Sequence, residues 1–188
     1  PTKASTKPTG CSNNIHAAVV SPPMGDYLVQ NYAGAESFTR LYKQTNSGYF
    51  RNRDRKFYEK GLIYADSGFF RVFSFKMIKG NEAEALKEPS SLVLTQTAAR
   101  KYFGDDEAYG KTLVQNDNKT YRITGIVKDP PENSHFHFNM LGAFADLEAE
   151  FGKAYFENWG AFSFHTYILL AEGVDMKDDE EHFPQMIS

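Results

Sequence analysis

The chain has 188 residues, a formal net charge of −3 at pH 7 and a hydrophobic fraction of 41%. This length and apolar content suffice for one domain, or two small lobes, with a real core, and they exclude a disordered chain. The slightly acidic balance supplies no basic field for a polyphosphate, so nucleic acid is not an expected partner. The single cysteine, Cys11, excludes an internal disulfide framework.

The two ends of the chain suggest a segment of a longer protein. It begins without Met and stops at Ser188, inside an expected helix. The run that ends in Cys11 looks like a lipoprotein cleavage site, but no apolar stretch precedes it, so we expect an inert thiol in a loose terminus. The longest apolar run, residues 167–171, is far shorter than the roughly 20 residues that a bilayer span requires.

The first third of the chain predicts a strand–helix–strand unit. Residues 15–20 form the first strand, and Ser21 then caps a helix that begins at Pro22. Apolar residues at four-residue spacing give that helix one apolar face. Residues 36–43 alternate and form the second strand. After a polar connection over residues 45–55, another strand is expected over residues 56–65.

The middle of the chain follows a different pattern. A short helix through Phe69, Phe70 and Phe73, capped by Asp66 or Ser67, leads to a strand over residues 75–78. A second strand over residues 92–94 precedes a helix with Thr95 as its N-cap and Gly104 as its left-handed C-cap. Residues 112–115 and 121–128 flank Asn116-Asp117-Asn118 and therefore predict a hairpin.

The last third predicts a second strand–helix–strand unit. Residues 135–144 alternate strictly, residues 145–156 form a helix, and residues 162–170 alternate again with Phe162 inward. A further helix starts near residue 173. Two such units around a different middle section predict an α+β fold, with a ferredoxin-like (porter-like) split βαβ sheet and an inserted smaller α/β lobe. We place the porter-like lobe at residues 1–65 and 135–188, and the inserted lobe at residues 66–134.

Three histidines are the candidates for a metal site. His135 and His137 are two apart on an expected strand, so both rings leave the same face and could chelate a metal. His165, on another strand, is the candidate third ligand. Solvent-facing histidines opposite Phe136 and Phe138 explain the same pattern without a metal, and we favour that interpretation.

A basic and aromatic segment is the second candidate. Arg51, Arg53, Arg55 and Lys56 lie beside Tyr49, Phe50, Phe57 and Tyr58, a mixture that can bind single-stranded nucleic acid. Asp54 and Glu59 interrupt the charge, however, and a solvated hairpin tip is the more ordinary interpretation. Contact with anionic lipid or with an acidic partner surface stays open.

The remaining polar clusters do not predict an active site. Asp105, Asp106 and Glu107 lack the ligand spacing of a calcium loop, and the acidic residues Asp175, Asp178, Asp179, Glu180 and Glu181 fit the first turn of a helix. Ser163 and His165 share a strand face, which is weak support for a nucleophile and its base. No glycine-rich phosphate loop or nucleophile motif is present. We predict no catalytic, cofactor-binding or metal-ligating residue.

Six blocks in order resemble one family. Tyr64 to Phe75 is similar to an "ADxxFFxVFSF" block, and Tyr121 to Pro131 to a "YxVTGVxxDPP" strand; the other similar blocks are 79–89 ("KG…ALxxP"), 92–104 ("VLTxxxAxxYFG"), 110–113 ("GKTL") and 133–138 ("NSHxxF"). The family is the MacB-like periplasmic core domain of FtsX-type ABC-transporter permeases. The resemblance is dense over residues 60–145. Ala108 and the run 33–36 depart from the family pattern, in loops.

The resemblance implies a periplasmic domain of a bacterial inner-membrane permease, inserted between the first and second transmembrane helices, with both ends on one side. It implies no enzyme activity, because a separate cytoplasmic ATPase subunit or domain hydrolyses ATP. The domain then transmits conformational change from the membrane helices to a substrate or partner protein. Its expected partners are its own transmembrane helices, a second permease copy, the ATPase and a periplasmic or outer-membrane protein.

Two other functions remain open on the sequence alone. An extracytoplasmic small-molecule or peptide-binding domain fits the aromatic richness equally well, because a Phe/Tyr core and a Phe/Tyr pocket look alike in sequence. An enzyme using His135, His137 or His165 requires a bound metal or turnover.

Overall fold

The structure is a computed structural model that describes residues 19–174. Its helices are α1 (Met24–Asn31), α2 (Phe69–Val72), α3 (Gln96–Phe103), α4 (Ala145–Phe151) and α5 (Lys153–Phe156). Its strands are β1 (Ala35–Gln44), β2 (Tyr49–Asn52), β3 (Arg55–Tyr58), β4 (Leu62–Ala65), β5 (Met77–Gly80), β6 (Ser91–Thr95), β7 (Thr112–Gln115), β8 (Lys119–Val127), β9 (Met140–Ala143) and β10 (His165–Leu170).

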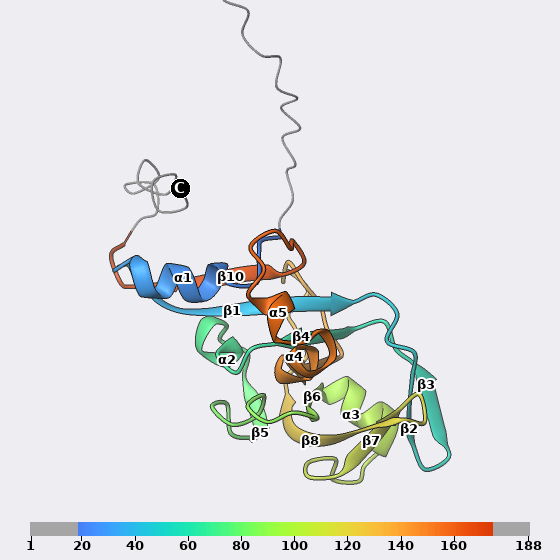
Figure 1. Cartoon of the computed structure of the whole chain (residues 1–188). Coiled ribbons are helices and arrows are strands. Elements are labelled where there is room, and N and C mark those ends of the chain that lie inside the picture. Colours follow the sequence, from blue (N-terminus) through green and yellow to red (C-terminus); the bar gives the residue numbers. More distant parts are fainter. Residues whose placement is uncertain (1–18, 175–188) are drawn as a thin grey trace, which may run out of the picture.

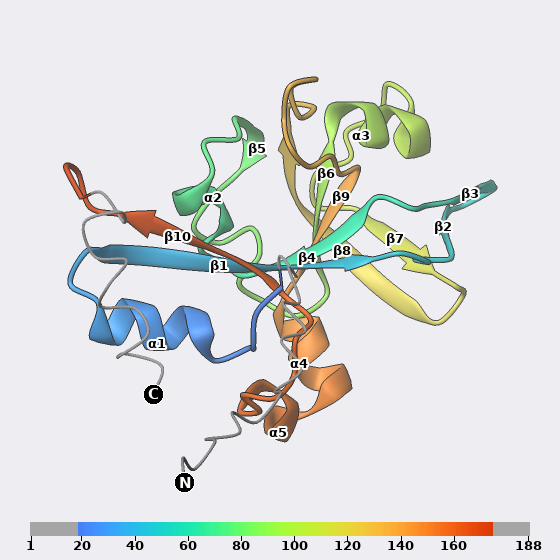
Figure 2. The ribbon, with the colours of Figure 1, turned by 90° about the horizontal axis from the view of Figure 1, so that it is seen from above.

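One hydrogen-bonded sheet runs through the domain in the order β10-β1-β4-β9-β6-β8-β7-β2-β3, and β5 pairs with β8 beside β7. Most neighbours are antiparallel, but β4 with β9 and β6 with β8 are parallel. Figures 1 and 2 show β10 and β1 at one end of the molecule and the β2–β3 hairpin protruding at the other. The fold is α+β, as predicted. The ferredoxin-like order of strands stays a prediction.

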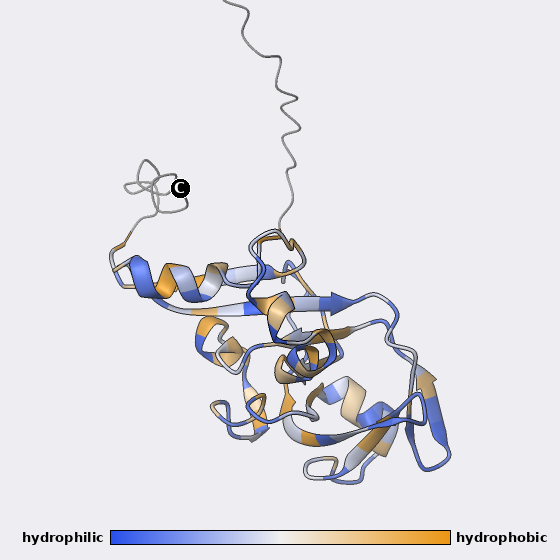
Figure 3. Ribbon diagram, viewed as in Figure 1, coloured by the Kyte–Doolittle hydropathy of each residue, from blue (hydrophilic) through white to orange (hydrophobic). Residues whose placement is uncertain are grey.

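Both faces of the sheet are covered near its centre. Alternate residues of β4 enter different clusters: Leu62 and Tyr64 pack with α3 and α4, whereas Ile63 packs with α2. In β6, Leu92 and Val93 separate in the same way. A strand that is buried on both faces needs apolar residues at every position, which is why these segments read as continuous apolar runs. Hydropathy colouring in Figure 3 places apolar residues in this centre and hydrophilic ones over most of the hairpin.

The local start and stop signals give mixed results. Thr95 caps α3 as predicted, because its hydroxyl accepts from the backbone N–H of Ala98 at 3.2 Å, and Gly104 follows with φ of 66°. Ser21 does not cap α1: the N-cap is Pro23 without a side-chain bond, and Ser21 is buried. The carboxylate of Asp66 does not cap α2 either, because it binds a neighbouring strand instead.

Two predicted segments are divided in the structure. The polar connection over residues 45–55 contains β2 and the start of β3, which pair as a hairpin. The expected strand over residues 56–65 is β3 and β4, separated by a break around the buried carboxylate of Glu59. The expected helix over residues 145–156 is interrupted at Gly152, whose φ of 79° takes it out of helical geometry.

The predicted strand over residues 135–144 forms only as β9. Phe136 and Phe138 alternate in sequence, but they pack into an aromatic cluster with Phe69 and Phe75 while the backbone before Met140 pairs little. Phe162 is 65% exposed and lies before β10, so its inward assignment is wrong. Of the first predicted strand, Val20 makes one bridge to Phe164, and residues 15–18 lie outside the described residues, as does nearly all of the helix expected from residue 173.

The two ends of the described chain leave on one side of the molecule. In Figure 1 both ends of the coloured ribbon lie along its upper edge, next to α1 and β10. Val20 bridges to Phe164 just before β10, and the backbone N–H of Ala171 just after β10 bonds to Gly34 at 2.9 Å. None of the helices within residues 19–174 has the length and apolar character needed to cross a bilayer.

Candidate functional site

A buried ion pair joins β1 to the turn before α2. Because β1 and β4 pair antiparallel with Leu41 opposite Ala65, Asp66 arrives beside Arg40. The Arg40 guanidinium donates from Nε at 3.0 Å and from Nη2 at 2.7 Å to the two oxygens of Asp66, and the Arg40 backbone N–H donates at 2.6 Å. The two side chains are only 9% and 16% exposed. This bidentate geometry is the strong form of a protein ion pair.

The same guanidinium contacts elements on its other sides. It lies over the ring of Phe144 at 4.1 Å, its Nη1 donates to the carbonyl of Pro22 at 3.4 Å, and Glu148 lies 3.8 Å away. Burial alone would lower the pKa of Arg40, but the hydrogen bond and the charge of Asp66 outweigh it and raise the pKa. Arg40 therefore stays charged and ties the start of α1, β1, the turn before α2 and α4 together. We call these contacts the Arg40 cluster.

A second buried carboxylate joins the base of the hairpin to the sheet. Glu59, 3% exposed, accepts from Lys101 Nζ at 2.5 Å, from the Tyr102 hydroxyl at 2.7 Å and from Asn139 Nδ2 at 3.2 Å. Burial raises the pKa of Tyr102, and the bond to Glu59 raises it further. These bonds connect the break after β3 to α3 and to the residue before β9. Both carboxylates therefore fasten junctions between elements.

The basic and aromatic segment lies on the β2–β3 hairpin. Two of its four cations pair with a single carboxylate, that of Asp117 in the turn between β7 and β8: Arg51 is 3.0 Å and Lys56 3.9 Å from its oxygens. Hydrogen bonds from Tyr49 and Arg51 lower the pKa of Asp117. Arg53 and Arg55 make no ion pair within the described residues. Sequence reasoning treated Asp117 only as a turn residue, and nothing local indicates its pairing with a strand 66 residues earlier.

The three histidines are not assembled into a site. His135 is exposed, and its Nε2 lies 2.9 Å from the hydroxyl of Tyr167; His137 is exposed as well. Across residues 19–174, no group of three or more His, Cys, Asp and Glu side chains could hold a metal ion. Ser163 bonds to the hydroxyl of Tyr155 at 2.6 Å. The structure thus gives His165 neither a partner ligand nor an activated serine.

The acidic candidates are on the surface. Asp106 and Glu107 lie 3.9 Å from Lys111 and 3.3 Å from Lys79, and Asp105 is exposed. A bond from the Tyr109 backbone, followed by one from Lys79, lowers the pKa of Glu107. The acidic group from Asp175 to Glu181 and Cys11 lie outside the described residues. Exposed carboxylates paired with lysines describe a solvated loop.

Comparison with known families assigns the chain. The sequence model of the MacB-like periplasmic core domain matches residues 5–185, almost the whole sequence. The chain belongs to this family. A search of curated proteins gives no significant match.

Solved structures share the fold at low sequence identity. A domain from Porphyromonas gingivalis, described as that of a permease protein, has a TM-score of 0.77 and 23% identity, covering 90% of this chain and 77% of its own. The periplasmic region of MacB from Actinobacillus actinomycetemcomitans has a TM-score of 0.68 and 17% identity, and the match covers 95% of this chain and 78% of that region. The extracellular domain of the noncanonic ABC-type transporter YknZ from Gram-positive bacteria has a TM-score of 0.63 and 14% identity, and the match covers 90% of this chain and 88% of that domain.

Family membership confirms the α+β class, the periplasmic location and the assignment to an ABC-transporter permease. It indicates a transporter domain rather than an enzyme. The family blocks contain one member of the Arg40 cluster and one partner of Glu59. The "AD" of the first block ends in Asp66, and the "YFG" block supplies Tyr102, which binds Glu59. The blocks therefore contain Asp66 itself, but of the Glu59 contacts they contain only the partners, because Glu59 lies before the first block.

Proposed function

We propose that this domain moves as one rigid body and transmits movement of the permease's membrane helices to a substrate or partner protein. The observation that carries the proposal is the continuous sheet. One edge strand of this sheet, β10, lies beside the two ends of the described chain. The other edge strand, β3, belongs to the protruding β2–β3 hairpin. The centre of this hydrogen-bonded sheet is packed on both faces and therefore resists bending, because interiors are close-packed and transmit strain. Movement imposed at β10 would therefore displace the hairpin.

The Arg40 cluster supports this rigidity at the end nearest the chain termini. It fastens α1, which the chain enters first, to β1, to the turn before α2 and to α4. Glu59 does the same at the base of the hairpin. The division into a porter-like lobe (1–65 and 135–188) and an inserted lobe (66–134) belongs to this proposal. In it, Asp66 holds the junction between the lobes, so that the two move together.

The β2–β3 hairpin is the proposed contact for a partner protein. Arg53 and Arg55 are exposed without an ion pair in the described structure, and Tyr58 on the edge strand is 76% exposed. An unpaired edge with cations and a tyrosine suits an acidic protein surface. Anionic lipid fits this hairpin less well, because the hairpin lies at the far end from the ends of the described chain, which in this proposal would lead to the membrane.

The remaining partners follow from the family. The domain would be joined to its own transmembrane helices and would work beside a second permease copy. A separate cytoplasmic ATPase subunit or domain would hydrolyse ATP. A periplasmic or outer-membrane protein would meet the hairpin.

Distance measurements by double electron–electron resonance on the full-length permease test rigid-body motion. Spin labels on Gln30→Cys in α1 and Asp54→Cys at the hairpin tip, both exposed positions, are introduced in a Cys11→Ser background. The distance between the two labels within one copy should be the same with and without ATP. The distance between Asp54→Cys labels on two copies should change with ATP. A change within the copy, or none between copies, refutes the proposal, and a permease with a hydrolysis-deficient ATPase serves as the control.

A further inference from the structure

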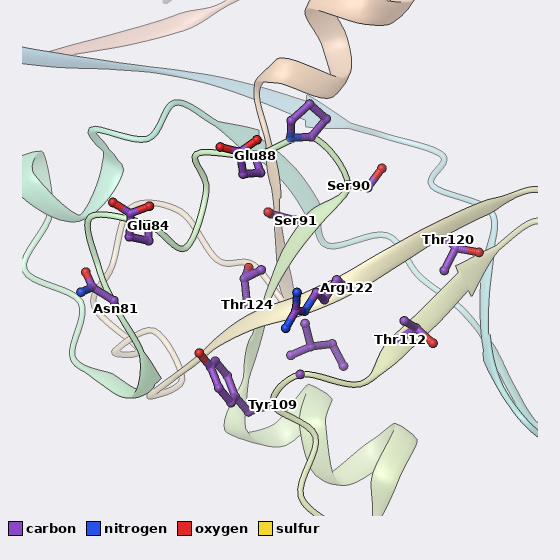
Figure 4. Close-up of a pocket in the computed structure, with 13 residues that line it drawn as sticks. Asn81, Glu84, Glu88, Ser90, Ser91, Tyr109, Thr112, Thr120, Arg122 and Thr124 are labelled. Carbon is purple, nitrogen blue, oxygen red and sulfur yellow. The ribbon is translucent and has the colours of Figure 1, made fainter.

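A hollow of about 520 Å³, lined mainly by residues with polar side chains, lies within the segment of residues 81–124, away from the junctions described above. Its floor is the face of β8 that points away from the core. Tyr121 and Ile123 enter the core, so Thr120, Arg122 and Thr124 face the hollow. Figure 4 shows their side chains together with the wall formed by Tyr109. Such a volume falls within the range of small-molecule sites.

Strand register centres this floor on one guanidinium. Arg122 pairs with Thr112 of β7 on one side and with Ser91 of β6 on the other, so these three residues form a row across the sheet. Thr120 and Thr124 precede and follow Arg122 on the same face, because side chains of a strand alternate. Arg122 is therefore ringed by hydroxyl groups from three strands. This arrangement is set by the backbone rather than by flexible loops.

The rim carries the opposite charge. The segment of residues 81–90 passes over the floor and brings Glu84 and Glu88 to the hollow, as Figure 4 shows. Glu84 bonds to Lys87, but Glu88 has no side-chain partner in the described structure, and neither has Arg122. Two opposite charges thus line one hollow, and they are not within the 4.0 Å of an ion pair.

We propose that this hollow binds a small zwitterion, a free amino acid or short peptide, with its carboxylate on Arg122 and its ammonium on Glu88. A guanidinium donates two parallel hydrogen bonds to a carboxylate, and the hydroxyls of Thr112 and Thr120 can donate to the same oxygens. The hydroxyl of Thr124 donates instead to the carbonyl of Ala85 at 2.6 Å. A simple anion such as phosphate fits less well, because the rim carboxylates repel it. A simple cation meets the same objection at Arg122. This site goes beyond the proposed mechanical role and does not depend on it.

Chemical-shift mapping of the ¹⁵N-labelled chain with L-alanyl-L-alanine as the probe tests the site. Saturable shifts at the amides of Thr112, Thr120 and Thr124 are expected, with millimolar affinity because the hollow is open. The N-acetylated dipeptide and the dipeptide amide each lack one charge and should bind at least about tenfold more weakly, since each loses a charge-assisted bond. Equal binding of the blocked peptides, or no shifts at these amides, overturns the proposal.

Matched variants identify the two charged groups. Arg122→Gln and Glu88→Gln should each weaken binding by about tenfold or more. Arg100→Gln and Asp105→Asn, exposed residues outside the hollow, should leave it unchanged. Circular dichroism verifies that each variant is folded, and the exposure of both target side chains favours this. Undiminished binding in Arg122→Gln, or equal weakening in the control variants, contradicts the assignment.

Discussion

Removal of Asp66 is the sharpest test of the Arg40 cluster. Asp66→Ala deletes the acceptor of three bonds from Arg40, two from the guanidinium and one from the backbone N–H. The Arg40 side chain, 9% exposed, would then be a buried charge with Glu148 at 3.8 Å as its nearest acid. Breaking a buried pair in this way costs about 3–5 kcal/mol. That is a large part of the ~5–15 kcal/mol that stabilises a typical domain.

Reversible urea denaturation followed by circular dichroism measures the loss. For a domain of this size, the cost corresponds to a fall of about 6–20 °C in the melting temperature. The double variant Arg40→Met, Asp66→Asn removes the buried charge but keeps an acceptor for the backbone N–H of residue 40. It should therefore regain at least half of the free energy of unfolding that Asp66→Ala loses. Asp106→Ala, which touches only an exposed pair, is the control and should not shift the midpoint. A loss below about 1 kcal/mol for Asp66→Ala, or a double variant weaker than the single one, would refute this reasoning.

Three further predictions concern single contacts. Thr95→Ala removes the cap on the N–H of Ala98 and should cost about 1 kcal/mol in urea denaturation, whereas Thr95→Ser should cost less. Gly25→Ala should destabilise by about 1–3 kcal/mol despite its better helix propensity, because the new methyl would overlap the ring of Phe38; a more stable variant would show that α1 can shift. Burial raises the pKa of Tyr64 from 10.0 to about 12, so above pH 10 this hydroxyl loses its proton more readily in the unfolded chain than in the folded one. The free energy of unfolding should therefore be unaffected by this group below pH 10 and should fall as the pH rises towards 12. In Tyr64→Phe this fall, measured by urea denaturation between pH 9 and 12, should be shallower, and an identical slope would contradict the assignment.

The sequence predicted those features that depend on residues close together in the chain, such as helix ends, turns and short strands. Thr95 and Gly104 bound α3 through bonds within a few residues, and the turn at Asn116-Asp117-Asn118 forms the expected hairpin because two short strands flank it. The strand predicted over residues 92–94 is β6, and the second half of the strand predicted over residues 56–65 is β4; that both are buried on both faces is seen only in the structure. The α+β class followed from these elements, because each signal is local.

Long-range pairing escaped prediction. Arg40 shares a strand face with Phe38 and Tyr42, which alternation alone indicates. The groups that compensate its buried charge and cover it, Asp66 and Phe144, come from distant segments that the local pattern does not identify. The alternation of Phe136 and Phe138 indicated a strand, but stacking with other aromatic rings explains the same pattern. The hollow around Arg122 also required the register of three strands. Such features depend on which distant segments pack together, and local sequence patterns do not show this.

The parallel pairing of β4 with β9 has a consequence for biosynthesis. Leu62 lies beside Met140, so the centre of the sheet closes only after nearly 80 further residues have been made. Until then β4 and β6 expose apolar edges on both sides of a missing strand, the kind of surface that aggregates. Chains truncated before residue 140 should therefore be insoluble and degraded, and complete chains should fold slowly. A periplasmic chaperone that covers bare strand edges would protect this domain during the interval before β9 arrives.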